Sequence, residues 1–188
     1  MQETVLCKRG KLILEDDFSG KNLLWTFDPD KCHWAIAEKA LVTESTGDKV
    51  ALSIERPITP VANAVFEMRV FLPRDCTVAL LGTWTNFPFA RISPTNGKLT
   101  LVTWSKETGM VEVAMAPFPY PEARWIDVLY EVSGSSYALT VDDQTVTCDM
   151  PFSGERSLTK IVIRPEQKTS SRLMVDDIKV WEALPKRR

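Results

Sequence analysis

The sequence predicts an all-β protein built as a two-sheet antiparallel β-sandwich. About a dozen β-rich runs follow one another at intervals of about 8–12 residues, separated by turn residues. No segment shows the periodicity of a convincing helix. The first and last runs, residues 12–18 and 173–181, each contain a pair of aspartates. Their matching character predicts that the two ends of the chain pair side by side and close one domain.

The last run also predicts an irregularity within its strand. Its apolar residues change parity, from Leu173 and Val175 before the aspartates to Ile178 and Val180 after them. Side chains alternate between the two faces of a strand, so this change requires one extra residue. We therefore expect a β-bulge at Asp176–Asp177.

The remaining strands are expected where apolar residues alternate or cluster between turn signals. Pro57 and Pro60 are expected to break the pattern, because proline is poorly tolerated within a sheet. Asn96-Gly97 is a strong hairpin signal. In chain order, the expected strands comprise residues 23–27, 34–36, 40–43, 50–54, 64–72, 78–81, 89–92, 99–104, 110–115, 124–132, 137–141, 145–148 and 158–164.

Two of these runs indicate how the sheets are covered. Along residues 64–72, Phe66, Met68, Val70 and Leu72 share one parity and are expected in the core. The outward set is Val65, Glu67, Arg69 and Phe71. The continuous apolar run at residues 78–81 is expected to be covered on both faces. Trp25, Trp34, Trp125 and Trp181 are assigned to the core.

Composition and length set the broad class. The 188 residues fit a single domain, 1–188, with its core at about residues 11–184. A hydrophobic content of 44% and a net charge of −2 indicate a soluble globular protein, and nothing in that balance calls for nucleic acid as a partner. The basic residues 186–188 are interpreted as a solvated tail. No run is long enough for a membrane-spanning helix.

The compartment and the oligomeric state stay open. Residues 1–11 lack the apolar stretch of a signal peptide, although a mature secreted or periplasmic domain is slightly favoured. The four cysteines, Cys7, Cys32, Cys76 and Cys148, are widely spread, so a zinc site is not indicated. Free buried thiols are favoured over one or two disulfides. The single histidine, His33, is interpreted as a structural or surface residue.

Several stretches together resemble concanavalin A-like (laminin-G-like) jelly-roll domains. The D-D-F-S-G of residues 16–20 leads to Trp25, as in the acidic-Phe opening of those domains. Residues 124–146 are similar to their late hairpin, with Asp143 where glycine is usual, and residues 175–180 match their terminal strand. The resemblance implies a jelly roll whose concave sheet commonly binds carbohydrate. Its relatives include lectin-like modules, glucanases and domains of the 3-keto-disaccharide hydrolase type.

The residues themselves supply little catalytic chemistry. The E-x-D-x-x-E pattern of laminarinase-type relatives is missing from the sequence. Asp127 and Glu131 lie four residues apart on one expected strand, about 13 Å at ~3.3 Å per residue, which is too far for a retaining pair. The sequence also contains no G-x-S-x-G motif and no phosphate-cradling glycine loop. Whether the domain is an enzyme stays open.

Aromatic and planar polar residues predict a glycan-binding groove instead. Sugars present apolar C–H faces ringed by hydroxyl groups, so stacking rings beside amide, carboxylate and guanidinium groups suit them. Core tryptophans and cross-strand ion pairs are the alternative interpretation of the same residues. Trp84→Ala and Arg91→Ala are expected to weaken glycan binding with little change in stability. The candidate ligand-binding residues are Trp84, Asn86, Arg91, Trp104, Glu67, Arg69, Glu112 and Tyr120.

A calcium ion is the one cofactor that the sequence suggests. Jelly-roll relatives often hold calcium near paired terminal strands, and hard cations require several oxygen ligands. Asp16 or Asp17 together with Asp177 could supply them, or these residues are simply turn and bulge residues.

From the resemblance and the candidate groove, we expect a domain that binds or acts on an oligo- or polysaccharide. The alternatives are a glycoside-processing enzyme and a structural interaction module without catalysis.

Overall fold

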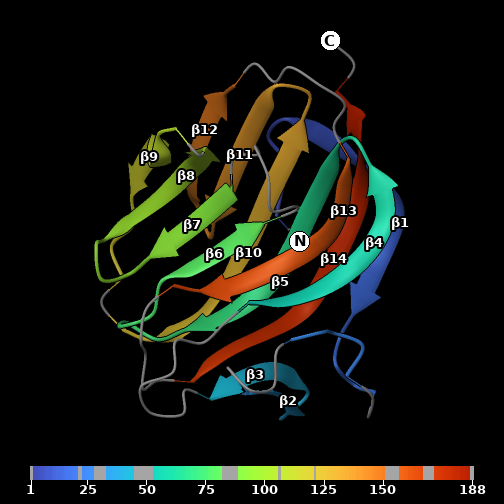
Figure 1. Ribbon diagram of the computed structural model, residues 1–188, viewed down its shortest axis with the longest axis vertical. Coiled ribbons are helices and arrows are strands. Elements are labelled where there is room, and N and C mark those ends of the chain that lie inside the picture. Colours follow the sequence, from blue (N-terminus) through green and yellow to red (C-terminus); the bar gives the residue numbers. More distant parts are fainter. Residues whose placement is uncertain are drawn as a thin grey trace.

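Every regular element of the structure is a β-strand within the part of the chain that it describes. This computed structural model describes residues 2–20, 23–27, 33–44, 53–81, 89–105, 107–120, 122–150, 157–166 and 172–186. These residues contain no helix long and apolar enough to cross a membrane. The strands form two antiparallel sheets layered face to face (Figure 1). The predicted two-sheet β-sandwich is therefore confirmed.

The larger sheet has eight strands and contains both ends of the chain. β1 (Cys7–Asp16) pairs with β14 outside the main path of the sheet. Along that path the order is β12 (Gln144–Asp149), β11 (Ser136–Val141), β10 (Arg124–Ser133), β5 (Ala64–Leu72), β14 (Leu173–Pro185), β3 (Ala40–Glu44) and β2 (His33–Ala37).

The second sheet has six strands and lies in front of the first in Figure 1. Consecutive strands pair as hairpins from β6 to β9. The full order is β4 (Ile54–Val61), β13 (Leu158–Pro165), β6 (Val78–Leu81), β7 (Phe89–Ser93), β8 (Lys98–Ser105) and β9 (Gly109–Pro117).

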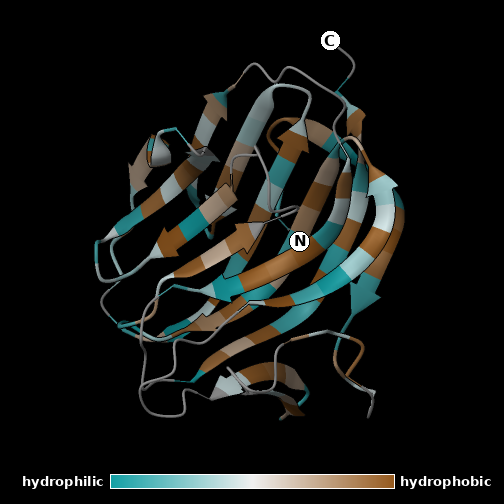
Figure 2. Ribbon diagram, viewed as in Figure 1, coloured by the Kyte–Doolittle hydropathy of each residue, from teal (hydrophilic) through white to brown (hydrophobic). Residues whose placement is uncertain are grey.

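The core lies between the sheets and is built from alternate residues of each strand. Hydrophobic and hydrophilic bands consequently alternate along many strands (Figure 2). On β5, Phe66, Met68, Val70 and Leu72 join the main core cluster, as their parity predicts. Val78, Ala79 and Leu80 of β6 are all buried, so this strand is covered on both faces as expected.

The first and last strands pair side by side within the larger sheet, as predicted. β1 and β14 run antiparallel, with Cys7 opposite Pro185 and Asp16 opposite Ile178. The register of β14 against β5 shifts between Asp176 and Lys179, and Asp177 has a φ of 50°. The predicted bulge is therefore present, and it keeps both halves of β14 facing the core.

Two local predictions differ from the structure, and a third falls mostly outside the described residues. Residues 23–27 form no strand, and only Thr26 makes an isolated bridge, to Glu55. β4 continues through Pro57 and Pro60, because it lies at the edge of its sheet, where a missing N–H is tolerated. Residues 45–52, which include most of the strand expected before these prolines, lie outside the described residues.

The tryptophans divide between the core and the outer surface of the larger sheet. Trp25 and Trp34 are buried in the main core, as predicted. Trp125 and Trp181 are only partly buried and pack against separate clusters, so their assignment to the core is wrong. Their positions on β10 and β14 have the parity that faces away from the opposite sheet.

Candidate functional site

The candidate site lies on the face of the six-stranded sheet that is turned away from the core. On β7, Ala90 and Ile92 belong to the main core, so Arg91 between them points to the other face. On β8, Leu99 and Leu101 are core residues, so Thr100 faces the same way as Arg91, its register partner. Hairpin pairing of β7, β8 and β9 thus brings outward side chains from three strands together.

Arg91 is the centre of an ion-pair network on this face. Its Nε donates to the carboxylate of Glu166, and its Nη1 lies 3.8 Å from Oε1 of Glu112. Lys98 Nζ holds the same Glu112 carboxylate at 2.7 Å. The side chains of Arg91 and Glu112 are 23% and 27% exposed, which leaves their planar groups partly open to solvent. The network fixes the direction of a guanidinium and a carboxylate at the surface.

Beneath these charges lies a buried layer of small and apolar side chains. Thr100 is fully buried, and among the described residues its Oγ1 has no hydrogen-bond partner. A buried hydroxyl without a partner carries a free-energy cost, and Thr100 is too deeply buried to contact a ligand directly. Phe89 and Val102 pack with Ala79 and Val162 in a buried cluster separate from the main core, so this part of the outer face is apolar and covered.

Trp104 supplies the aromatic surface at the end of this strip. Trp104 is 42% exposed and is the second-to-last residue of β8, before the hairpin to β9. It lies opposite Met110 of β9. Trp104 lies four residues along the strand from Thr100, about 13 Å at ~3.3 Å per residue. The strip from Arg91 to Trp104 therefore offers hydrogen-bonding groups at one end and a stacking ring at the other.

Part of the predicted site is assembled by the fold. Arg91, Trp104 and Glu112 share one face, as the groove hypothesis requires. Trp84 and Asn86, which follow β6 and precede β7 in the chain, lie outside the described residues.

Glu67 and Arg69 do not belong to this groove. Both are outward residues of β5, which lies in the eight-stranded sheet, so they face the opposite side of the sandwich. The expectation of a single groove containing them together with Arg91 is therefore wrong. β5 pairs with β10 and β14, two strands far away in the sequence, and no local pattern reports such pairing.

Tyr120 is a structural residue and not a surface one. It is 6% exposed, stacks on Phe118 at a centroid distance of 5.3 Å, and its burial raises its pKa. Its hydroxyl donates to the carbonyl oxygen of Leu72 at 2.6 Å and accepts from the backbone N of Arg124 at 2.8 Å. The hydroxyl is fully used within the protein, which leaves it nothing to offer a glycan.

The proposed calcium ligands have unequal freedom. Asp16 accepts hydrogen bonds from Trp25 Nε1 at 3.0 Å and from Arg56, so it is committed to the protein. Asp17 and Asp177 are more open, but the described residues contain no group of three acidic, histidine or cysteine side chains that could share one ion. Calcium binding by Asp17 and Asp177 therefore stays a prediction.

Three residues of the site were not predicted from sequence. Lys98 and Thr100 follow from the alternation of β8, since both flank the core residue Leu99. Glu166 comes directly after β13, which reaches Arg91 only because β13 pairs with β6 and β6 with β7. Parity could have found the first two, whereas no sequence signal indicates the third.

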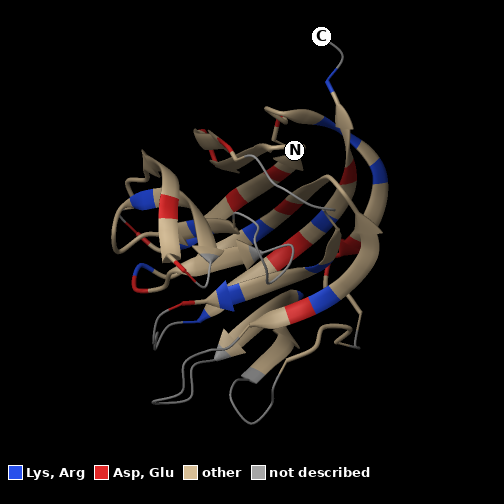
Figure 3. Ribbon diagram, turned by 45° about the horizontal axis from the view of Figure 1, so that its top comes forward, with Lys and Arg blue, Asp and Glu red and all other residues tan. Residues whose placement is uncertain are grey.

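The charges on the surface are mixed. In Figure 3, positive and negative residues are interspersed along the strands, with no broad area of one sign in this view. Such a surface suits a ligand that both donates and accepts hydrogen bonds more than it suits a polyanion.

Comparison of the sequence with protein families and with curated proteins gives no match. Comparison of the fold with solved structures does give matches. A carbohydrate-binding module from Bacillus subtilis is 11% identical, with a TM-score of 0.62 over 85% of this chain and 96% of its own. A laminarinase from Flavobacterium sp. UMI-01 is 13% identical, with a TM-score of 0.63 over 92% of this chain and 100% of its own.

An endo-β-galactosidase from Clostridium perfringens that releases GlcNAcα1-4Gal is also similar. It is 13% identical, with a TM-score of 0.67 over 100% of this chain and 67% of its own. Another similar structure, from Bacillus subtilis, is described as having a galectin-like fold. At these identities the comparisons show the fold, a jelly-roll-like sandwich.

Proposed function

We propose that the domain binds an oligo- or polysaccharide on the outer face of its six-stranded sheet. The observation that carries this proposal is the strip from Arg91 to Trp104. It places a guanidinium and a carboxylate, both held by ion pairs, in line with a 42% exposed indole ring. Each sugar ring needs both an apolar surface and oriented polar groups, and this strip supplies the two together.

The ion-paired state of the acidic groups supports binding more than catalysis. Glu112 is held by Arg91 and Lys98, and Glu166 is held by Arg91. Glycoside hydrolysis needs one carboxyl group to donate a proton and another to attack or to activate water. In this network both carboxylates already have cationic partners. The similar folds of carbohydrate-binding and carbohydrate-degrading proteins agree with a saccharide ligand and support no particular sugar.

Replacement of Trp104 by alanine tests the proposal. The expected loss is roughly 1–3 kcal/mol of affinity, the contribution of one stacking ring, for glycans that a glycan array identifies with the unmodified protein. Because Trp104 is half-exposed, the thermal midpoint should change little. Leu184→Ala, at a similarly exposed apolar residue of β14, is the matched control and should bind normally. Unchanged binding by Trp104→Ala, or an array without any hit, contradicts the proposal.

A test at Arg91 requires a more conservative substitution than alanine. Its partner Glu166 is only 9% exposed, so Arg91→Ala would leave a nearly buried carboxylate without its partner and would destabilise the fold. We therefore replace the expectation that Arg91→Ala changes stability little with a prediction that it destabilises the protein. Arg91→Lys keeps the positive charge and removes the planar fork, and should weaken binding while the protein stays folded.

One observation favours the alternative of a self-associating structural module. β9 is an edge strand, and its Met110, Val111, Val113 and Met115 are all exposed. Exposed apolar edges of sheets are sites of association between chains. Sedimentation of the protein across a concentration series separates the two functions: a dimer that dissociates when Met115 is replaced by lysine, without glycan binding, supports the structural module.

A further inference from the structure

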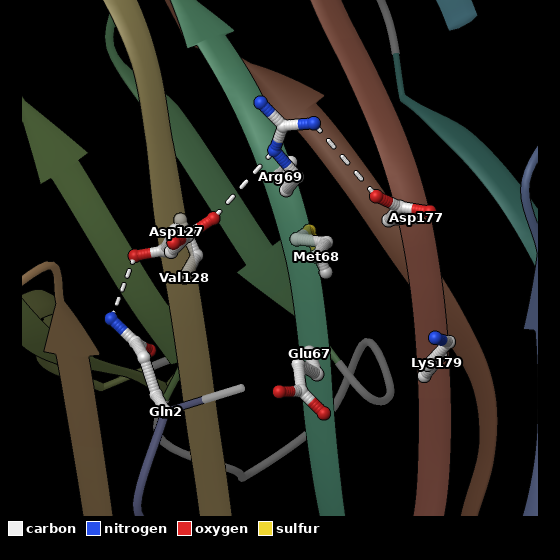
Figure 4. Close-up of a pocket in the computed structure, with 8 residues that line it drawn as sticks. All are labelled: Gln2, Glu67, Met68, Arg69, Asp127, Val128, Asp177 and Lys179. Atoms are coloured by element: carbon white, nitrogen blue, oxygen red, sulfur yellow. Dashed lines mark hydrogen bonds and ion pairs between the residues drawn. The ribbon is translucent and has the colours of Figure 1, made fainter. Parts of the chain in front are cut away.

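The outer face of the eight-stranded sheet contains a second polar depression, separate from the strip described above. By register, Arg69 of β5 lies beside Asp127 of β10, and Glu67 lies beside Lys179 of β14. They surround a pocket of about 270 Å³ together with Asp177 and Gln2. Figure 4 shows these side chains arranged around the space, with Arg69 between Asp127 and Asp177.

Hydrogen bonds hold the walls of this pocket in place. Gln2 belongs to the segment before β1, and its Nε2 donates to the carbonyl oxygens of Asp127 at 3.2 Å and Asp142 at 2.8 Å. Arg9 Nη2 donates to the carbonyl oxygen of Gln2 at 2.6 Å and also binds the Glu67 carboxylate. The N-terminal segment is therefore fixed as one side of the pocket.

Arg69 is held in place, yet its hydrogen-bonding groups remain open. Its guanidinium lies over the Trp125 ring at 5.1 Å, which orients the planar group. Its closest approaches to Asp127 and Asp177 are 3.7 Å and 3.9 Å, too long for hydrogen bonds. Among the described residues none accepts a hydrogen bond from it, and its side chain is 46% exposed. Arg69 can therefore donate to a ligand without first losing a bond.

Charged groups of both signs line the pocket, and they indicate the class of ligand. Among the lining residues, Glu67, Asp127 and Asp177 are negative and Arg69 and Lys179 are positive, while Arg9 pairs with Glu67 and Glu15 pairs with Lys179 from outside the pocket. An anion meets three carboxylates in this pocket, and a cation meets Arg69 and Lys179. A neutral molecule whose hydroxyl groups both donate and accept can use the carboxylates and the cations together.

We propose that this pocket is a second saccharide-binding site, which takes one neutral sugar residue with its hydroxyl groups between Arg69 and the flanking carboxylates. The site shares a ligand class with the proposed function but none of its residues. Two sites on opposite faces of one domain would let a single molecule bridge two glycan chains.

The test uses NMR titration of the full chain with neutral methyl glycosides of glucose, galactose and N-acetylglucosamine. At least one should shift amide signals of β5, β10 and β14. Arg69→Met should weaken this response roughly tenfold or more, since it removes a charged donor, and leave signals of β8 and β9 unaffected. Trp104→Ala is the control on the opposite face and should leave the pocket response intact. Should Arg69→Met fail to fold, Lys179→Met replaces it with the same expectation.

The outcomes separate this inference from the proposed function. Shifts at β8 and β9 with none at the pocket, or a pocket response that Arg69→Met does not weaken, overturn the second site. Shifts at the pocket alone support it while contradicting the site at Trp104. Stronger binding of glucuronate, glucosamine or a free amino acid at the pocket overturns the assignment to neutral sugars.

Discussion

Glu131 is the most completely buried acidic residue of the described chain. On β10 its carboxylate accepts hydrogen bonds from three consecutive backbone N–H groups, of Val5 at 2.7 Å, Leu6 at 2.9 Å and Cys7 at 3.2 Å. The Cys7 thiol lies 3.2 Å from the same carboxylate. This contact and, above all, burial raise the pKa of Cys7 to about 12, so the thiol stays protonated and unreactive at neutral pH. Glu131 thus fastens the N-terminal segment to the larger sheet.

Glu131→Ala should lower the free energy of unfolding by about 3 kcal/mol, because it leaves one buried and two partly buried N–H groups without an acceptor. Urea denaturation measures this loss. Alkylation of Cys7, followed by mass spectrometry, should become faster in the variant. Glu122→Ala, at an exposed position before β10, is the control and should behave as the unmodified protein. Equal urea midpoints for Glu131→Ala and the unmodified protein would show that the anchor is unimportant.

At this scale the sequence identifies residue types but not their partners. Asp16 is one of two alternative calcium ligands that the sequence suggests, yet its acceptors are used by Trp25, nine residues away, and Arg56, forty residues away. Tyr120 was interpreted as a ligand-binding ring, yet its hydroxyl is bonded to Leu72, forty-eight residues away. These partners are set by the packing of distant strands, which no short pattern contains.

The bulge in β14 combines a left-handed backbone conformation with a disfavoured negative charge. Asp177 adopts a positive φ of 50°, and its N–H donates to Oδ1 of Asp176 at 2.8 Å. Burial, with the negative charges of Asp177 and Asp17 as further causes, raises the pKa of Asp176. The ionised form of Asp176 is therefore disfavoured in the folded state. Stability should fall as the pH rises from the ordinary aspartate value of 3.8 through the raised folded value, and stay lower above it.

Asp176→Asn should raise the thermal midpoint at pH 7 by roughly 1–2 °C, since it keeps the acceptor for Asp177 N–H and removes the disfavoured charge. The gain should disappear at a pH below about 3, where aspartate is protonated in both states. Calorimetry at the two pH values measures both effects. Asp143→Asn, in the exposed turn after β11, should show neither. A lower midpoint for Asp176→Asn at pH 7 would mean that the charge stabilises the bulge.

Elements were predictable where a local period determines them. The alternation within β5 and the parity change in β14 identified the inward faces and the bulge. The order of strands was not predictable, and this is why Glu67 was grouped with Arg91 although the two lie on different sheets. Pro57 and Pro60 illustrate the same limit, because only the position of β4 at a sheet edge makes them acceptable.

On the scale of the whole molecule, the sandwich presents two outer faces with different chemistry. The six-stranded sheet carries Trp104 and the Arg91 network, and the eight-stranded sheet carries the pocket at Arg69. Both faces depend on one rigid core between the sheets, so substitutions on one face should leave the other intact. The central claim is that the first of these faces binds glycans.

The indole N–H signals of the six tryptophans test that claim most directly. They can be followed by NMR during titration with the glycan that gives the strongest array signal. The account predicts that the Trp104 signal shifts and saturates, while those of the buried Trp25 and Trp34 stay in place. A glycan that binds without moving the Trp104 signal would contradict the account.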